Sequence, residues 1–145
     1  MNKVARQSAV IRYRLAPDGL QVLLITSRET RRWVIPKGNI GRGRSTRAAA
    51  ELEAYEEAGV RGVADNIPLG FYTYGKSLTD GTAQPTVVEV FALHVRKEAK
   101  NWPEKAERQS LWMTPQEAAK RVLEPGLAVL LLRLAHCHQP CKSAA

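Results

Sequence analysis

Three of the four glutamates in the run AAELEAYEEAGV, which covers residues 49–60, have a spacing that suits one face of a helix. Glu53, Glu56 and Glu57 are spaced as i, i+3 and i+4, so a helix would place their carboxylates on one stripe. Like charges at this spacing destabilise a helix unless a cation lies among them, and hard oxygen ligands suit Mg²⁺ or Mn²⁺. The run therefore predicts a divalent-metal site, and a solvated acidic helix face is the alternative.

Basic residues gather just ahead of the glutamates, in a chain whose formal net charge is +8. They are Arg28, Arg31, Arg32, Lys37, Arg42, Arg44 and Arg47. A cluster of this kind predicts an anionic partner, and a solvated basic face or a nucleic-acid surface are the alternatives. No predicted helix concentrates basic residues as a DNA groove reader would, so a DNA-binding protein is disfavoured.

Length and composition predict one globular domain over residues 1–136, followed by a polar tail over residues 137–145. The chain has 145 residues with 44% hydrophobic and 25% charged content, and no apolar run approaches the roughly 18 residues that span a membrane. Charges interrupt the N-terminal apolar residues, and Cys137 and Cys141 are the only cysteines, so we expect a soluble, cytoplasmic protein without disulfides. The tail sequence HCHQPC could hold a metal, although a polar tail is the simpler interpretation.

Two apolar, β-branched runs near the N-terminus predict a β-hairpin. Residues 8–14 and 21–26 are these runs, and Pro17–Gly19 is the turn between them. Trp33–Ile35 is a further short apolar segment, in which we expect Trp33 to be a core residue rather than a platform for a base. Pro36 ends the segment.

The glutamate run is predicted to form a helix after a glycine-rich loop that contains Gly38, Gly41 and Gly43. Ser45 or Thr46 can cap its start, and Gly59 suits the left-handed position just past its end. An apolar stripe lies nearly opposite the glutamates and is expected to face the core. The stripe consists of Ala48, Leu52, Tyr55 and Gly59.

The second half of the chain predicts more strands and two helices, and hence a mixed sheet. Thr114, Pro115 and Glu117 form a capping-box pattern at the start of the first of these helices. In chain order, we expect strands at 69–76 and 86–95 joined by a turn at 79–82, a polar loop at 101–109, a short strand at 111–113, a helix at 115–123, a break at 124–126 and a last helix at 127–135.

The spacing of the glutamates matches a known motif. The pattern G-x14-E-A-Y-E-E-x-G-V, from Gly38 to Val60, resembles the Nudix box of the Nudix hydrolases, a loop, helix and loop that bind divalent metal in that family. The resemblance implies a Nudix fold of the α+β or α/β class, with a mixed β-sheet sandwiched between helices. It also implies that Gly38, Glu53, Glu56 and Glu57 occupy the metal-ligand positions, with Gly38 contributing its carbonyl oxygen.

Two positions depart from the box. Arg44 stands where the family usually has its first glutamate, and Leu52 stands where it has the arginine before Glu53. Replacing both members of a charge pair can leave the stability of the protein nearly unchanged, whereas replacing one member leaves the other charge unpaired. In the family the arginine helps to orient the adjacent glutamate, so its absence bears on the catalytic rate more than on metal binding.

The resemblance extends to segments outside the box and assigns further residues. Residues 26–39, 101–103 and 111–123 look like the branch of diphosphoinositol polyphosphate and diadenosine polyphosphate phosphohydrolases, and still more like a group of short bacterial Nudix proteins. Basic residues bind substrate phosphates in that branch, which nominates Arg28, Arg32 and Lys37, with Arg6 and Lys76 as weaker candidates.

The catalytic assignment falls on the box glutamates. Glu53 and Glu57 are the catalytic candidates, and the general base stays open among Glu53, Glu57 and Glu107. Glu89, in the middle of a predicted strand, is a further acidic candidate that could face either way. For Glu107 and Glu89, a surface carboxylate is the simpler interpretation.

The leading hypothesis is a pyrophosphohydrolase that uses Mg²⁺ or Mn²⁺ and acts on a nucleoside or inositol polyphosphate. The rival is a Nudix-fold binding module with a decayed box, which senses a polyphosphate or RNA. Arg44 and Leu52 favour the rival. The sequence leaves both a monomer and a homodimer open.

Overall fold

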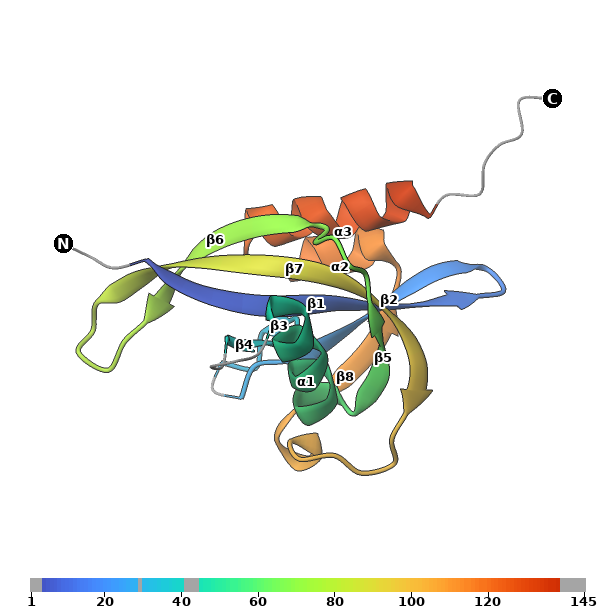
Figure 1. Cartoon of the computed structure of the whole chain (residues 1–145), viewed down its shortest axis with the longest axis horizontal. Coiled ribbons are helices and arrows are strands. Elements are labelled where there is room, and N and C mark those ends of the chain that lie inside the picture. The colour runs from blue at the N-terminus through green and yellow to red at the C-terminus, as the bar shows by residue number, and fades with distance from the viewer. Residues whose placement is uncertain (1–3, 29, 41–44, 139–145) are drawn as a thin grey trace.

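The computed structural model describes residues 4–28, 30–40 and 45–138, and within them eight strands form one mixed sheet (Figure 1). The strands are β1 (Ala5–Ala16), β2 (Gly19–Thr26), β3 (Trp33–Val34), β4 (Lys37–Asn39), β5 (Val60–Ala64), β6 (Gly70–Ser77), β7 (Ala83–Glu98) and β8 (Ser110–Met113). The helices are α1 (Thr46–Ala58), α2 (Pro115–Arg121) and α3 (Pro125–Cys137), with a short 3₁₀ turn at Lys105–Glu107.

The sheet divides where β1 changes its antiparallel partner. The main strand order is β3-β2-β1-β7-β5, in which β1 runs parallel to β7 and the other neighbours are antiparallel. The second half of β1 pairs with β2, whereas its residues Gln7–Ala9 pair with Lys37–Asn39 of β4. This division leaves room at one end of the sheet, and the candidate site forms there.

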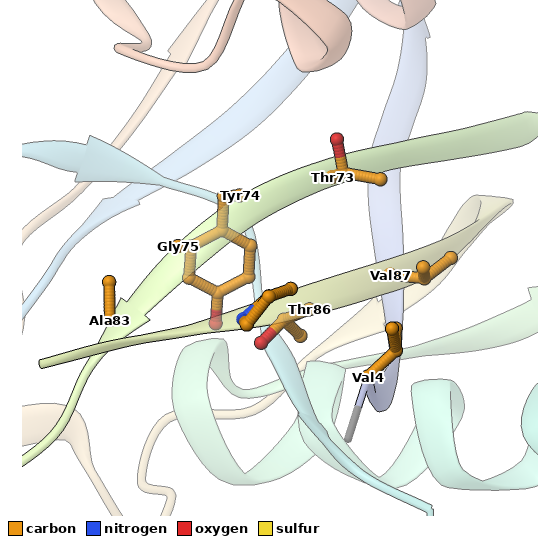
Figure 2. A pocket seen from close by; sticks show the side chains of 8 residues that line it. Val4, Thr73, Tyr74, Gly75, Ala83, Thr86 and Val87 are labelled. Carbon is orange, nitrogen blue, oxygen red and sulfur yellow. The ribbon is translucent and has the colours of Figure 1, made fainter. Parts of the chain in front are cut away.

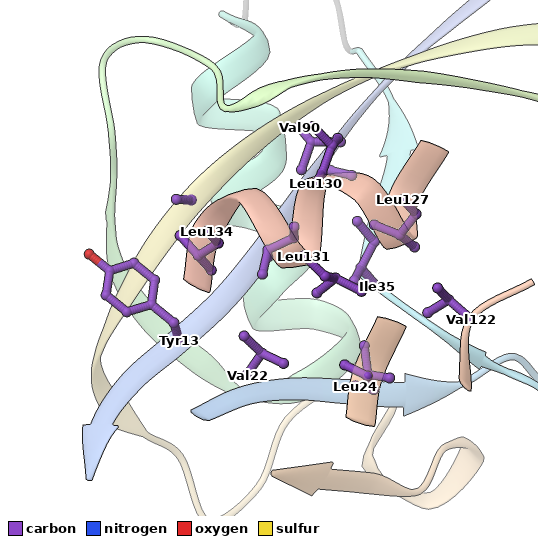
Figure 3. Packing of buried hydrophobic residues seen from close by; sticks show 14 of the residues in the cluster. Tyr13, Val22, Leu24, Ile35, Val90, Val122, Leu127, Leu130, Leu131 and Leu134 are labelled. Atoms are coloured by element: carbon purple, nitrogen blue, oxygen red, sulfur yellow. The ribbon is translucent and has the colours of Figure 1, made fainter. Parts of the chain in front are cut away.

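The helices cover opposite faces of the sheet. Alternate residues of β1 point to opposite sides. Ile11 belongs to the larger core cluster, where α3 packs with Leu127, Leu131 and Leu134 (Figure 3). Val10 belongs to the second cluster, under α1. The predicted class, a mixed sheet between helices, is confirmed.

Three strands were not predicted, namely β3, which lies in the short apolar segment, β4 and β5. β4 and β5 are short and contain a glycine: β4 has no β-branched residue, and Gly62 interrupts the segment between the two valines of β5. At Gly62 in β5, an added Cβ would lie 2.1 Å from the carbonyl oxygen of His94 on β7. Close backbone pairing, rather than side-chain composition, therefore makes this segment a strand.

Helix α1 begins and ends as predicted. The Ser45 hydroxyl accepts a hydrogen bond from the backbone N–H of Ala48 at 3.0 Å, and Gly59 caps the C-terminus with a φ of 69°. The predicted turn at 79–82 also forms, because the Asp80 carboxylate accepts hydrogen bonds from both the backbone and the hydroxyl of Thr82.

The predicted core face of α1 is wrong. The residues of α1 in the second core cluster are Ala50, Ala54 and Ala58. Alanines let the helix approach the sheet closely, whereas the larger Leu52 and Tyr55 remain half-buried on a flank, where the Arg61 guanidinium lies 4.0 Å from the centre of the Tyr55 ring. The acidic and buried faces therefore overlap, and Glu57 is buried with them.

The boundary between the last two helices also differs from the prediction. Thr114 caps α2 as expected, its hydroxyl accepting from the backbone N–H of Glu117 at 3.1 Å. The helix ends at Arg121, and Pro125 and Gly126 form the first turn of α3 instead of a break. Proline is well accommodated at a first helical position, because its missing N–H has no partner there in any case.

Candidate functional site

Helix α1 carries the glutamates to the point where the sheet divides. A Cβ added to Gly38 of β4 would lie 2.2 Å from Glu53 Oε1, so the Glu53 carboxylate rests directly against the glycine. The Glu57 side chain is hydrogen-bonded to Glu53, and the residue is only 6% exposed. Glu56 is half-buried on the same helix. The structure thus brings Gly38, Glu53 and Glu57 together, and their role as metal ligands stays a prediction.

Burial raises the pKa of Glu57 to about 9, and the hydrogen bond that the protonated Glu57 donates to Glu53 adds to this increase, while Arg108 opposes it. The Arg108 guanidinium lies 3.5 Å from Glu57 Oε1. The Glu57 carboxyl group therefore keeps its proton at neutral pH, in a place where a divalent cation could substitute for that proton.

The donor set fits a hard divalent cation, because it consists of carboxylate oxygens beside the backbone of a glycine, which has no side chain to block access to its carbonyl oxygen. Within the described ranges, no three acidic, histidine or cysteine side chains already converge as a metal cluster. Binding of a cation would therefore require the side chains around the Glu53–Glu57 pair to rearrange.

Stabilisation by Mg²⁺ is expected to increase with pH. Because the folded-state pKa of Glu57 lies above its ordinary 4.5, the stability that its proton contributes is complete below that value and is lost as pH rises through about 9. Metal competes with this proton, so the rise in melting temperature at a fixed Mg²⁺ concentration should be larger at about pH 8.5 than at about pH 6. Differential scanning fluorimetry measures this rise. An equal or smaller rise at the higher pH would contradict the expectation, and Glu57→Gln should remove the pH difference.

A loop between β7 and β8 docks on the C-terminal end of α1. The backbone N–H of Ala99 donates to the Gly59 carbonyl at 2.7 Å, and that of Glu104 donates to the Glu56 carbonyl at 3.0 Å. The Trp102 ring lies against Gly59, where an added Cβ would be 2.2 Å from the nearest ring atom. This docking places the following residues beside the glutamates.

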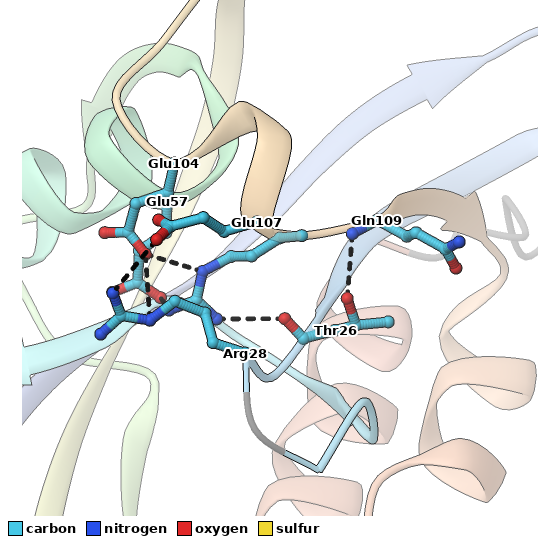
Figure 4. A network of polar contacts seen from close by, with 7 residues as sticks. Thr26, Arg28, Glu57, Glu104, Glu107 and Gln109 are labelled. Atoms are coloured by element: carbon cyan, nitrogen blue, oxygen red, sulfur yellow. Dashed lines mark hydrogen bonds and ion pairs between the residues drawn. The ribbon is translucent and has the colours of Figure 1, made fainter.

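The docked loop supplies a polar network (Figure 4). Arg108 donates from Nε to Glu104 at 2.9 Å and from Nη1 to the Thr26 carbonyl at 3.1 Å, in addition to its contact with Glu57. Arg28 lies 3.8 Å from both Glu104 and Glu107. Glu104 is therefore nearer to the buried carboxyls than the predicted Glu107, whose side chain is 49% exposed.

A cavity of about 370 Å³ opens beside this network. Within the described part of the chain, its charged lining residues are Arg28, Arg32, Lys37, Glu57, Lys76 and Arg108. All three residues nominated for phosphate binding thus line it, together with Lys76, whereas Arg6 is exposed elsewhere. Glu57 joins the carboxyl pair to the cavity.

The nominated cations already have partners. Arg32 Nη1 donates to Glu124 at 2.6 Å, and Lys37 Nζ lies 5.2 Å from the centre of the Tyr74 ring. Burial lowers the pKa of Lys37. The Tyr74 hydroxyl in turn donates to Gln7 at 2.7 Å, so the cavity wall is fixed by side-chain contacts.

A larger hollow of about 530 Å³ lies at the outer end of β6 and β7 (Figure 2). Its lining is mostly apolar, with Val4, Pro85 and Val87 among the residues, and none of the described residues that line it is charged. The chemistry that suits phosphate therefore belongs to the smaller cavity.

Sequence reasoning missed Arg108, Glu104 and Arg12. Arg108 and Glu104 stand in a polar loop, and their place beside Glu57 depends on the docking of Trp102 on Gly59. Arg12 is fully buried in β1, and burial lowers its pKa to about 9, which Glu57 opposes. Its segment IRYR alternates as a half-exposed strand would, so the sequence carried no sign of this burial.

The other predicted residues are placed as follows. Glu89 is half-buried on β7, and Trp33 is partly buried against the larger core cluster, as expected for a packing role. Arg44, Gly41 and Gly43 lie outside the described residues, and so does Cys141 of the proposed metal clip. No helix in the described residues combines the length and apolar character needed to cross a membrane.

Comparisons with known proteins agree with this geometry. A curated relative, "Nudix hydrolase 12, mitochondrial" of Arabidopsis thaliana, is 37% identical over 102 residues, which are 68% of this chain and 50% of the relative. This chain thus spans about half the length of that protein. Two solved structures share the fold. An Ap4A hydrolase of C. elegans has 17% identity and a TM-score of 0.68, and the match covers 94% of this chain and 100% of that chain. The NUDIX domain of Shewanella oneidensis NrtR complexed with ADP ribose has 13% identity and a TM-score of 0.71, and the match covers 96% of this chain and 91% of that chain.

The profile of the NUDIX domain spans almost the whole described fold, from β1 into the last turns of α3. It matches residues 5–134, which include the paired carboxyls of α1, the glycine of β4 beneath them and the loop docked on the helix end. With the glutamate spacing, the mixed sheet between helices and this match in agreement, the chain belongs to the Nudix family.

Proposed function

We propose that this protein is a pyrophosphohydrolase that uses Mg²⁺ or Mn²⁺ to cleave a diphosphate linkage in a nucleoside or inositol polyphosphate. One observation carries the proposal: the Glu53–Glu57 carboxyl pair adjoins a cavity in which, among the residues that the structure describes, the other charged lining residues are all cationic. Carboxylates without such a cavity would suit metal storage, and cations without the carboxylates would suit ligand binding alone. Their combination suits phosphoryl chemistry.

Glu53, Glu56, Glu57 and the Gly38 carbonyl oxygen would hold the metal. When bound, the metal would neutralise phosphate charge and lower the pKa of a bound water. Either Glu53 or Glu57 would accept the proton of the attacking water, and Glu104 joins Glu107 as a candidate because it lies nearer to the pair.

Arg28, Arg32 and Lys37 would bind the substrate phosphates. Phosphate would have to compete with Glu104 and Glu107 for Arg28, and with Glu124 for Arg32. Arg28 is the most accessible of the three, since 56% of its side chain is exposed. Guanidinium groups suit this role because they can bind phosphate through two parallel hydrogen bonds.

The substrate class follows from charge. The proteins of similar fold include an Ap4A hydrolase and a domain complexed with ADP ribose, both of which take phosphate-bridged ligands. The cavity here offers several cations within about 370 Å³, which suits a polyphosphate of either the nucleoside or the inositol type.

The alternative is a catalytically impaired binding module. Leu52, in place of the box arginine, lies on the flank of α1 with Tyr55 and Arg61, in a separate surface hollow. A protein of this kind would bind a polyphosphate or RNA in its basic cavity without turnover. Chelator separates the two functions, because a binder that does not need metal would retain its ligand.

Hydrolysis should be detected in a panel of dinucleoside polyphosphates, nucleoside diphosphate sugars and diphosphoinositol phosphates. With Mg²⁺ or Mn²⁺ present, at least one class is expected to release product, measured by ion-exchange chromatography, and excess EDTA should abolish the release. Binding without product release in any class would favour the binding module and refute the enzymatic proposal.

Location and assembly stay predictions. The word mitochondrial belongs to the name of the Arabidopsis relative, and the cytoplasmic location of this chain stays a prediction. Monomer and homodimer are both compatible with a cavity built from a single chain.

A further inference from the structure

Glu124 stands at the N-cap of α3, a position from which a side chain can accept hydrogen bonds from the exposed backbone N–H groups of a helix. The Glu124 side chain makes no such capping bond. Instead, its Oε1 accepts from Arg32 Nη1 at 2.6 Å, between residues 92 positions apart in the chain. Only 10% of the Glu124 side chain is exposed, against 35% of the Arg32 side chain. The carboxylate therefore joins α3 to a distant segment rather than stabilising its own helix.

The position of Glu124 is set by the packing of α3 on β6. Pro125 lies in the first turn of the helix, and a Cβ added to Gly126 would lie 2.7 Å from the Cβ of Tyr72 on β6. Because Gly126 has no side chain, the start of the helix can lie directly against the strand. Leu127 follows, fully buried in the larger core cluster. The core thus fixes the backbone from which the Glu124 side chain extends.

Arg32 ends the turn that joins β2 to β3. The backbone N–H of Ser27 donates to the Arg32 carbonyl at 2.8 Å, and that of Arg31 donates to the Ser27 carbonyl at 3.1 Å. These bonds fix the backbone of the turn, but they leave the long Arg32 side chain free to adopt several rotamers. The contact with Glu124 is what orients its guanidinium.

Arg32 lines the cavity together with further cations, namely Arg28, Lys37, Lys76 and Arg108. Like charges repel one another, which favours an Arg32 side chain turned away from the cavity unless a counter-charge holds it. Glu124 is not among the described residues that line the cavity, so its carboxylate holds Arg32 from behind the wall. A guanidinium has five N–H donors in a planar fork, so phosphate and Glu124 compete for only part of it.

We propose that Glu124 is a positioning residue that holds the Arg32 guanidinium in the cavity wall and thereby pre-organises it for a phosphate group of the substrate. This inference rests on the proposed function, which gives Arg32 a substrate phosphate. Glu124 acts through Arg32 and does not touch the substrate. An arginine that is already ordered loses less conformational entropy on binding, so the contact strengthens the binding of phosphate.

Glu124→Ser tests this role, because serine is too short to reach Arg32 and is a favourable N-cap residue for α3. Isothermal titration calorimetry in EDTA, with inorganic tripolyphosphate as the probe, measures binding without turnover. We expect the dissociation constant to rise by about 3–10-fold, the affinity lost when one long side chain must become ordered on binding. With the most active substrate of the panel, KM should rise by a similar factor while kcat changes little.

Glu124→Gln is the conservative variant, since its amide oxygen can still accept from Arg32 Nη1. It should bind tripolyphosphate at least as tightly as the wild type, because it keeps the contact and removes a negative charge near the cavity. Glu117→Ser is the matched control. Glu117 accepts from Arg121 at 3.2 Å on α2, away from the cavity, and its replacement should leave the dissociation constant unchanged.

Arg32→Met separates an effect through Arg32 from a general effect on the fold. Adding Glu124→Ser to Arg32→Met should not weaken tripolyphosphate binding further, because the group that Glu124 positions is already absent. If Glu124→Ser does not fold, Glu124→Leu takes its place in both backgrounds, because leucine also removes the carboxylate.

Unchanged or tighter binding in Glu124→Ser would overturn the inference alone, and so would the same weakening with and without Arg32. A lower melting temperature with unaltered affinity would assign Glu124 a purely structural role and overturn it too. Absence of tripolyphosphate binding by the wild type would also refute the inference, and hydrolysis of the substrate panel would then decide the proposed function separately.

Discussion

Glu57→Gln is expected to lower kcat by about 10³-fold or more while the protein stays folded. Glutamine keeps the shape of the side chain but removes the negative charge that would bind a divalent cation. A metal contributes several kcal/mol to the stabilisation of transition-state charge in phosphoryl transfer, and each 1.36 kcal/mol corresponds to about tenfold in rate. Initial rates on the most active substrate of the panel, with saturating Mg²⁺, give the measurement.

Glu117→Gln provides the control for this experiment. Glu117 also lies on a helix and pairs with an arginine, since its carboxylate accepts from Arg121 at 3.2 Å, but it is exposed and distant from the cavity. Exposed pairs four residues apart on a helix contribute only about 0.3–0.5 kcal/mol, so activity should not change. If Glu57→Gln retained more than about a tenth of the wild-type kcat, Glu57 would not be a metal ligand, and the carboxyl pair would lose its proposed role.

Residue spacing in the box predicted the ends of α1 and the positions of its glutamates, whereas residue hydrophobicity did not predict which face of α1 is buried. Ser45, Gly59 and the i, i+3, i+4 glutamates fixed the helix, its ends and the residues beside Gly38, because these features depend on local geometry. The face of the helix that packs on the sheet was predicted incorrectly. Hydrophobicity favoured Leu52 and Tyr55, whereas close approach favoured Ala50, Ala54 and Ala58.

The surroundings of the glutamates could not be predicted from local patterns. Arg12 is hidden because α1 covers that part of β1, and Arg108 reaches Glu57 because Trp102 fixes its loop on the helix end. Both depend on contacts between segments far apart in the chain.

Gly59→Ala is expected to destabilise the protein more than an alanine substitution that introduces only backbone strain at a turn glycine. Alanine at the φ of 69° costs about 1 kcal/mol, and its Cβ would lie 2.2 Å from a Trp102 ring atom, which must then move. Overpacking of this kind costs a further 1–3 kcal/mol or so. For a chain of this size the melting temperature should fall by roughly 5–15 °C, measured by calorimetry in EDTA.

Gly81→Ala separates the strain from the collision with Trp102. Gly81 has a φ of 85° in the turn between β6 and β7, but nothing lies within 4 Å of its added Cβ. Gly81→Ala therefore introduces backbone strain without a steric clash, and its melting temperature should fall by roughly 2–4 °C. Gly59→Ala should also reduce hydrolysis by the folded protein, because movement of Trp102 releases the loop that holds Glu104 and Arg108 beside Glu57. Equal losses of melting temperature in the two variants, with hydrolysis unaffected in both, would show that the docked loop does not position the site.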